Sequence, residues 1–243
     1  MYSVFLASAI AFLLGFSGVF VDWWHWGWGI LFTVIAFVAA WVVIARRIGA
    51  KVQPAMTQVQ KQMEAGLLDA ALQSLEDLLP LGRWVPMLRG QLLGNMGMVA
   101  WMANKKEKAL QLLEGASIRA TDARLLFACI LWKNGDNARA LQVLQVAGAV
   151  NKKHALLHNT WAWMLHKQEK NDDAQKLLAA FQKRDPGNEP TKDNLLRLQN
   201  RTRMAMQGFG MHWYLLGLEQ PPQTMGQVRR APKGFREPPK GRG

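Results

Sequence analysis

The stretch ALLHNTWAWMLHKQEKNDDAQKLLAAFQKRDPGN, residues 155–188, decides the fold of this chain. It opens with a dozen mainly apolar residues that favour a helix, and a short polar break follows. Ala174, Leu178 and Phe181 then recur at offsets of zero, four and seven, which places them on one face of a second helix. Asp185-Pro-Gly-Asn188 closes the stretch with a turn. The stretch therefore predicts a unit of helix, tight turn and helix.

The same pattern occurs three more times before this stretch, anchored on an alanine that leucine follows by four residues. The anchors are separated by 38, 31 and 34 residues: Ala71, Ala109, Ala140 and Ala174. A break lies five residues before each anchor: Gly66, Asn104, Gly135 and Glu169. A small residue lies twelve before three of them, with valine in the first unit: Val59, Gly97, Ala128 and Ala162. Internal repeats of about this length are typical of solenoids.

This pattern resembles the tetratricopeptide repeat (TPR) family over roughly residues 55–188. The fourth unit matches best, since Pro186 follows Ala174 by twelve residues as in the closing turn of that family, and the first three units lack this proline. The resemblance implies an all-α solenoid of about four helix pairs; a generic helical bundle is the alternative. Pro190 and Thr191 open a further predicted helix, over 193–206, that caps the solenoid.

The first 45 residues predict a membrane hairpin. They contain one charge, Asp22, and two apolar runs, 2–21 and 28–45, each long enough to cross a hydrocarbon core of ~30 Å. A cleaved signal peptide is the alternative, but no basic region precedes the first run. The expected fold is therefore two transmembrane helices followed by the solenoid.

Residues at the two ends of the predicted spans indicate how the hairpin is oriented. Four tryptophans of the connecting turn are typical of a membrane interface: Trp23, Trp24, Trp26 and Trp28. Arg46 and Arg47 follow the second span directly, and they are also expected to contact anionic lipid. The positive-inside rule then places both termini and the repeats in the cytoplasm. The predicted location is a bacterial inner membrane, with a multi-pass topology.

The expected domain organisation follows from these segments. In chain order the segments are a transmembrane hairpin (1–47), a juxtamembrane linker (48–54), TPR-like repeats (55–188), a capping helix with an apolar segment (189–218), and a disordered basic tail (219–243). The last fifteen residues of the tail carry six basic residues and one acidic residue. The tail is rich in Pro and Gly, so it cannot bury a core.

The TPR resemblance implies that the first helix of each unit lines a concave groove. The groove-facing positions lie eight and eleven residues before each anchor. They are Met63, Trp101, Trp132 and His166, together with Gln60, Met98, Cys129 and Trp163. Such an apolar trough suits an amphipathic helix or an apolar peptide segment of a protein partner. The alternative is that these side chains are ordinary core.

The apolar segment Met211–Leu218 has no place in the repeat count. Three interpretations of it stay open. It folds back into the trough and masks it, it lies on the membrane interface, or it packs against the last helix.

The sequence contains no common catalytic signature, so we expect neither an enzyme nor a cofactor. His154 and His158 are four residues apart but have no evident third partner, and we predict no metal site. Cys129 lies among apolar residues and is interpreted as an inert buried thiol.

The predicted function is that of a membrane-anchored scaffold or adaptor that recruits partner proteins through the trough. One alternative is a structural subunit of a membrane protein complex, packed through small residues of the first span: Ala7, Ala11, Gly15 and Gly18. The other is an RNA- or ribosome-associated factor that acts through the basic tail. The net charge of +13 fits acidic partners in general, and nucleic acid is the less favoured of them.

Overall fold

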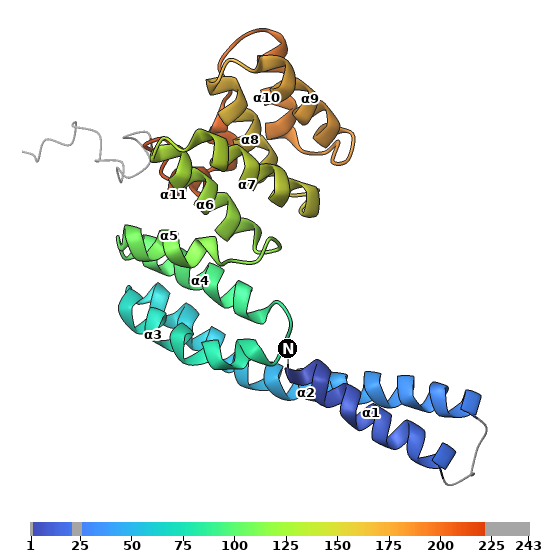
Figure 1. Cartoon of the computed structure of the whole chain (residues 1–243). Coiled ribbons are helices and arrows are strands. Elements are labelled where there is room, and N and C mark those ends of the chain that lie inside the picture. Colours follow the sequence, from blue (N-terminus) through green and yellow to red (C-terminus); the bar gives the residue numbers. More distant parts are fainter. Residues whose placement is uncertain (1, 21–25, 222–243) are drawn as a thin grey trace, which may run out of the picture.

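The computed structural model describes residues 2–20 and 26–221, and every regular element within these ranges is a helix. The elements are α1 (Tyr2–Phe20), α2 (Trp26–Glu64), α3 (Leu68–Leu78), η1 (Leu79–Arg83), α4 (Leu88–Met102), α5 (Lys106–Glu114), α6 (Thr121–Lys133), α7 (Asn137–Val150), α8 (Ala155–Lys167), α9 (Asn171–Gln182), α10 (Glu189–Gln199), η2 (Met206–Phe209) and α11 (Met211–Leu215). Figure 1 shows a hairpin of α1 and α2 projecting from a stack of shorter helix pairs.

The arrangement of the shorter helices is TPR-like, as the repeat pattern predicts. Successive pairs α4/α5, α6/α7 and α8/α9 stack in chain order, and the end of α2 pairs with α3 to form the first unit. All four anchor alanines are 0% exposed, and so are the four leucines that follow them by one helical turn. The predicted inward face is thus the face that packs. The small residues let the two helices of a unit approach closely: a Cβ on Gly97 would lie 2.6 Å from Cγ of Leu113.

The four predicted breaks are the turns between the two helices of each unit. Each residue adopts a left-handed conformation, with φ of 73° at Gly66, 59° at Asn104, 85° at Gly135 and 63° at Glu169. A positive φ at this point reverses the chain after a helix. Only Glu169 is a residue type that rarely adopts it.

The long spacing between the first two anchors has a structural cause. After α3 the chain makes the short helix η1 and a further loop, residues 84–87, before α4 begins. The other units lack such an insertion between their pairs. This insertion reaches the start of α1 (Figure 1).

The hairpin joins the repeats without a break. α2 is 39 residues long and includes Pro54, so the segment expected to be a separate linker, 48–54, is part of this helix. By length and composition α2 is the one helix among the described residues that could cross a membrane, whereas the apolar part of α1 described in full, Tyr2–Leu13, is shorter. None of the apolar window of α2 is buried.

The inner face of α1 is made of small residues. Ser3, Ala7 and Ala11 are at most 1% exposed, and the helix beside them is α2. The first half of the predicted small-residue stripe therefore packs within the hairpin. The side chains of residues 14–20, which would continue the stripe, lie outside the described part of the structure.

The C-terminal cap is shorter than predicted. Asn188 caps α10, accepting a hydrogen bond from the backbone N–H of Thr191 at 3.1 Å. The helix ends at Gln199, so the expected extension to Met206 is wrong. Buried polar side chains hold α10 on α8: Nδ2 of Asn159 donates to Oγ1 of Thr191 at 2.7 Å, and Nδ2 of Asn194 donates to Oδ1 of Asn159 at 3.0 Å. After α10 the chain turns back across the repeats.

Candidate functional site

Three tryptophans of the first helices form one continuous apolar surface. Trp101 near the end of α4 and Trp132 near the end of α6 lie eight residues before their anchors, whereas Trp163 of α8 lies eleven residues before its anchor, one turn earlier in its helix. The rings of Trp132 and Trp163 meet edge to face with centroids 6.3 Å apart. We call the surface formed by these three residues the trough.

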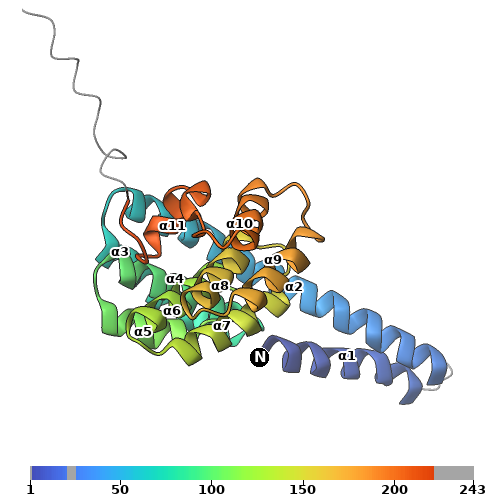
Figure 2. The ribbon, with the colours of Figure 1, turned by 90° about the horizontal axis from the view of Figure 1, so that it is seen from above.

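The C-terminal segment of the chain occupies the trough. Trp213 of α11 is 0% exposed, and its ring meets Trp163 edge to face at 5.4 Å. Its indole N–H donates to Oε2 of Glu219 at 2.8 Å, so the one polar atom of the buried ring is satisfied. Figure 2 shows α11 on the side of α6 and α8 that is turned away from α5 and α7. We call residues 211–218 the cover. Of the three interpretations of this segment, the structure shows that it folds back, but onto the tryptophan part of the predicted groove only.

Close backbone approach completes the cover. Gly217 has a φ of +70°, and a Cβ there would lie 3.3 Å from Nζ of Lys133 and 3.8 Å from the ring of Trp101. The same ammonium lies 5.7 Å from the centre of the Trp101 ring, and Nζ of Lys167 lies 5.2 Å from that of Trp163. Cation–π contacts of this kind hold lysines at the rim of the aromatic surface.

The end of the concave surface nearest the hairpin is open. A cavity of about 350 Å³ lies there between α2 and α4. Its lining is mostly methionine, valine and glutamine, and it consists of Gln53, Met56, Thr57, Val59, Gln60, Met63, Leu75, Asn95, Met98 and Val99. Three of the predicted groove residues, Gln60, Met63 and Met98, thus meet in one cavity. Flexible methionine side chains can adapt to ligands of different shape.

Sequence reasoning missed Met56 and Glu219 of this site, and it left the position of Trp213 open. Met56 precedes Gln60 by four residues and Met63 by seven, so the three share one face of α2. Extending the groove positions by one further turn would have found Met56. Trp213 and Glu219 carry no periodic signal, because they lie beyond the repeats.

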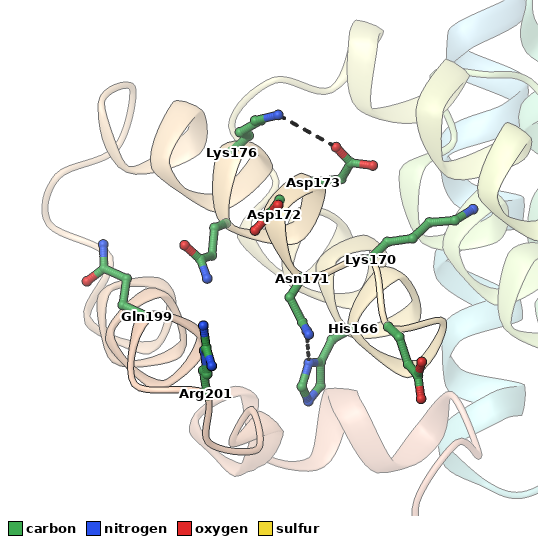
Figure 3. A pocket seen from close by; sticks show the side chains of 10 residues that line it. His166, Lys170, Asn171, Asp172, Asp173, Lys176, Gln199 and Arg201 are labelled. Carbon is green, nitrogen blue, oxygen red and sulfur yellow. Dashed lines mark hydrogen bonds and ion pairs between the residues drawn. The ribbon is translucent and has the colours of Figure 1, made fainter.

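Two predicted groove residues lie elsewhere. Cys129 is 0% exposed within α6, and burial raises the pKa of its thiol. His166 lines a separate polar cavity of about 780 Å³ at the turn between α8 and α9, where its Nδ1 lies 2.6 Å from Oδ1 of Asn171. Figure 3 shows Arg201, which follows the end of α10, on the other side of this cavity from His166 and Asn171.

His158 is a buried histidine in apolar surroundings. It is 3% exposed, its ring lies 4.8 Å from that of Phe181, and neither of its ring nitrogens has a hydrogen-bond partner of good geometry. Burial lowers the pKa of His158, an effect that the nearby backbone of Asn151 partly opposes. His154 instead caps α8, and its Nδ1 accepts from the N–H of Leu157 at 3.2 Å. The two histidines therefore do not share a ligand site.

The residues predicted for the membrane interface are described only in part. Trp23 and Trp24 lie outside the described residues, and the side chain of Trp26 is likewise not described. Trp28 is 58% exposed near the start of α2, and Arg46 and Arg47 are exposed after its apolar window. The basic stretch 229–243 also lies outside the described residues. Within the described part of the chain, no group of three or more His, Cys, Asp and Glu side chains could hold a metal ion.

No protein-family model matches the sequence, and no curated protein matches it. Among solved structures the chain is similar to YrrB, whose crystal structure is described as that of a TPR protein with an unusual peptide-binding site. The identity is 20% and the TM-score 0.45, over 67% of this chain and 84% of YrrB. The class of the chain, an all-helical protein with TPR-like pairs, rests on the helix pairing and the buried anchors described above.

Proposed function

We propose that the chain is a membrane-anchored TPR-like adaptor that binds an amphipathic helix or apolar segment of a partner protein in its concave surface. In this proposal the chain is a binding protein and has no catalytic role. The partner occupies the open cavity of Met56, Met63 and Met98, beside the trough that the cover fills. The adaptor is held at the cytoplasmic face of a bacterial inner membrane.

The observation that carries this proposal is the cover itself. The concave surface already holds a short apolar helix, with Trp213 fully buried against Trp163. A surface that takes a helical turn of its own chain has the shape and apolar character to take one from another protein. The open cavity continues the same surface toward the hairpin, since Met98 and Trp101 are one turn apart on α4.

The membrane anchor in the proposal is the hairpin of α1 and α2. Large apolar side chains of both helices are exposed, among them Phe5 at 73% and Leu13 at 69%. Soluble surfaces rarely carry an apolar patch of this extent, whereas a bilayer would cover it. Arg46 and Arg47 favour a cytoplasmic end at this point of α2. Burial of Ala7 and Ala11 beside α2 weighs against the alternative in which these residues pack on another subunit.

Site-specific photocrosslinking in intact cells tests the proposal. A photoreactive residue replaces Gln60, which is exposed and lines the cavity, and a control chain carries it at exposed Ala180 of α9. We expect one defined protein to crosslink from position 60 only. Met63→Glu in the same chain should lower that yield about tenfold or more, because it places an unpaired carboxylate against an apolar ligand.

The anchor is tested in the same cells by alkaline extraction of membranes. The chain should stay in the membrane pellet, and protease added to right-side-out vesicles should leave the repeats intact. Equal crosslinking from positions 60 and 180, or yields that Met63→Glu leaves unchanged while helicity is kept, would contradict the binding role.

A further inference from the structure

The loop between η1 and α4 contacts the first residues of the hairpin. Both the backbone N–H and the hydroxyl of Ser3 donate to the carbonyl oxygen of Trp84, the former at 3.3 Å. The rings of Tyr2 and Trp84 have centroids 5.7 Å apart. Figure 1 shows this loop beside the N-terminal end of α1. The inserted residues therefore tie the repeats to the end of the hairpin.

This contact lies at the level where the apolar part of the hairpin ends. α1 and α2 are antiparallel and rise ~1.5 Å per residue, so the start of α1 lies beside the part of α2 around Arg46 and Arg47. In the proposed anchor, these two residues mark the cytoplasmic headgroups. The loop then lies at the same depth.

The chemistry of the loop suits that depth. Arg83, the last residue of η1, and Arg89, the second residue of α4, flank the loop and are exposed; within the loop Trp84 is 39% and Met87 44% exposed. The chain has no acidic residue from 78 through 106, nor from 23 through 63. The charged side chains of the two segments that meet here are therefore all basic. Tryptophan favours the headgroup region, and arginine places its guanidinium among phosphates while its stem stays on apolar surface.

We propose that residues 83–89 are a second membrane contact, which binds the anionic headgroups of the bilayer and fixes the orientation of the repeats against it. This inference rests on the membrane anchor of the proposed function. The loop binds at the surface and does not cross the bilayer. It holds the repeats through the ties that Trp84 makes to Tyr2 and Ser3, so the open cavity faces the cytoplasm at a set angle.

A spin label on the full-length chain measures the depth of the loop. Met87→Cys provides the attachment point, since the native Cys129 is fully buried. The labelled chain is reconstituted in vesicles of phosphatidylcholine with or without phosphatidylglycerol. With phosphatidylglycerol, collisions with oxygen and a nickel chelate should place the label among the headgroups. Without it, or in ~1 M salt, where the Debye length is about 3 Å, the label should move into water.

A pair of matched variants tests the arginines. Arg83→Gln with Arg89→Gln should lower the ratio of membrane-bound to released label about 25-fold, from two cations near an anionic surface. Lys152→Gln with Lys153→Gln removes two exposed cations from the distant turn between α7 and α8 and should leave the ratio unchanged. A photoactivatable phosphatidylglycerol, added to the unsubstituted chain, should crosslink within residues 83–89.

Four results decide between this inference and the proposed anchor. If alkaline extraction strips the chain from the vesicles, the anchor itself is wrong, and the inference falls with it. If the chain is retained but the label stays in water with phosphatidylglycerol present, only the loop contact is refuted. An equal decrease in the ratio of membrane-bound to released label in the two double variants would also overturn the loop contact. So would lipid crosslinks confined to α1 and α2.

Discussion

Truncation of Trp213 to alanine is expected to undock the cover, because this side chain is its most deeply buried part. The ring is 0% exposed, its centroid lies 5.4 Å from that of Trp163, and its indole N–H donates to the carboxylate of Glu219. Replacement of a buried tryptophan by alanine costs about 3–5 kcal/mol. Since these contacts exist only in the docked state, the free energy that holds the cover falls by about that amount.

Amide hydrogen exchange of the full-length protein in nanodiscs measures this loss. The amides to follow are those of Trp213, Leu216 and Gly217, which donate to carbonyls within the cover or directly before it. Their protection should fall about 100-fold or to the unprotected limit, because tenfold corresponds to about 1.4 kcal/mol. Amides of α7 should not change.

The matched control for this prediction is Leu215→Ala in the same helix. Leu215 is 59% exposed, and truncation of such a surface residue changes stability by about 0.5 kcal/mol or less. Unchanged protection in Trp213→Ala would refute the docking described here. So would an equal loss of protection in both variants, which would show that the helix frays for reasons other than this contact.

Four further variants test the packing of the repeats by urea denaturation in the same nanodiscs. The wild type should lose stability as the pH falls below about 6.5. The histidine of the unfolded chain then binds a proton, whereas buried His158 in the folded chain stays neutral until its lowered pKa is reached. His158→Phe should flatten this dependence of stability on pH, and an unchanged dependence would argue against the role of His158. Glu169→Gly should stabilise by up to about 1 kcal/mol through relief of the positive φ, and Asn104→Gly should do less because asparagine tolerates that conformation. Gly97→Ala should destabilise the folded repeats by up to about 2 kcal/mol, because overpacking against Leu113 outweighs the gain in helix propensity of about 1 kcal/mol. A more stable variant would show that the Leu113 side chain can move aside.

The repeats could be predicted from the sequence because their determinants are local. The anchor alanines recur at offsets that only a helix places on one face, and the breaks lie at a fixed distance from them. Even Glu169, a poor residue for a left-handed turn, was identified by its place in the pattern. Its φ of 63° shows that the position in the repeat outweighed the preference of the residue.

The cover and the continuous α2 could not be predicted because their determinants are not local. Whether Trp213 lies on Trp163, on a bilayer or on α10 depends on which surfaces the folded repeats expose, and periodicity carries no such information. The segment 48–54 contains Pro54, which favours a break when considered alone. Helix on both sides of it, with one end packed against α3, keeps the segment helical.

One consequence follows from the unbroken course of α2. Gln53, Met56, Gln60 and Met63 form one wall of the open cavity, and they belong to the helix that carries the apolar window. In the proposed function this helix, about 60 Å long, has the bilayer at one end and the partner-binding cavity at the other. A change in bilayer thickness or in the tilt of the hairpin would therefore turn or widen the cavity directly. The affinity of the protein for its proposed partner would then depend on the thickness and tension of the membrane.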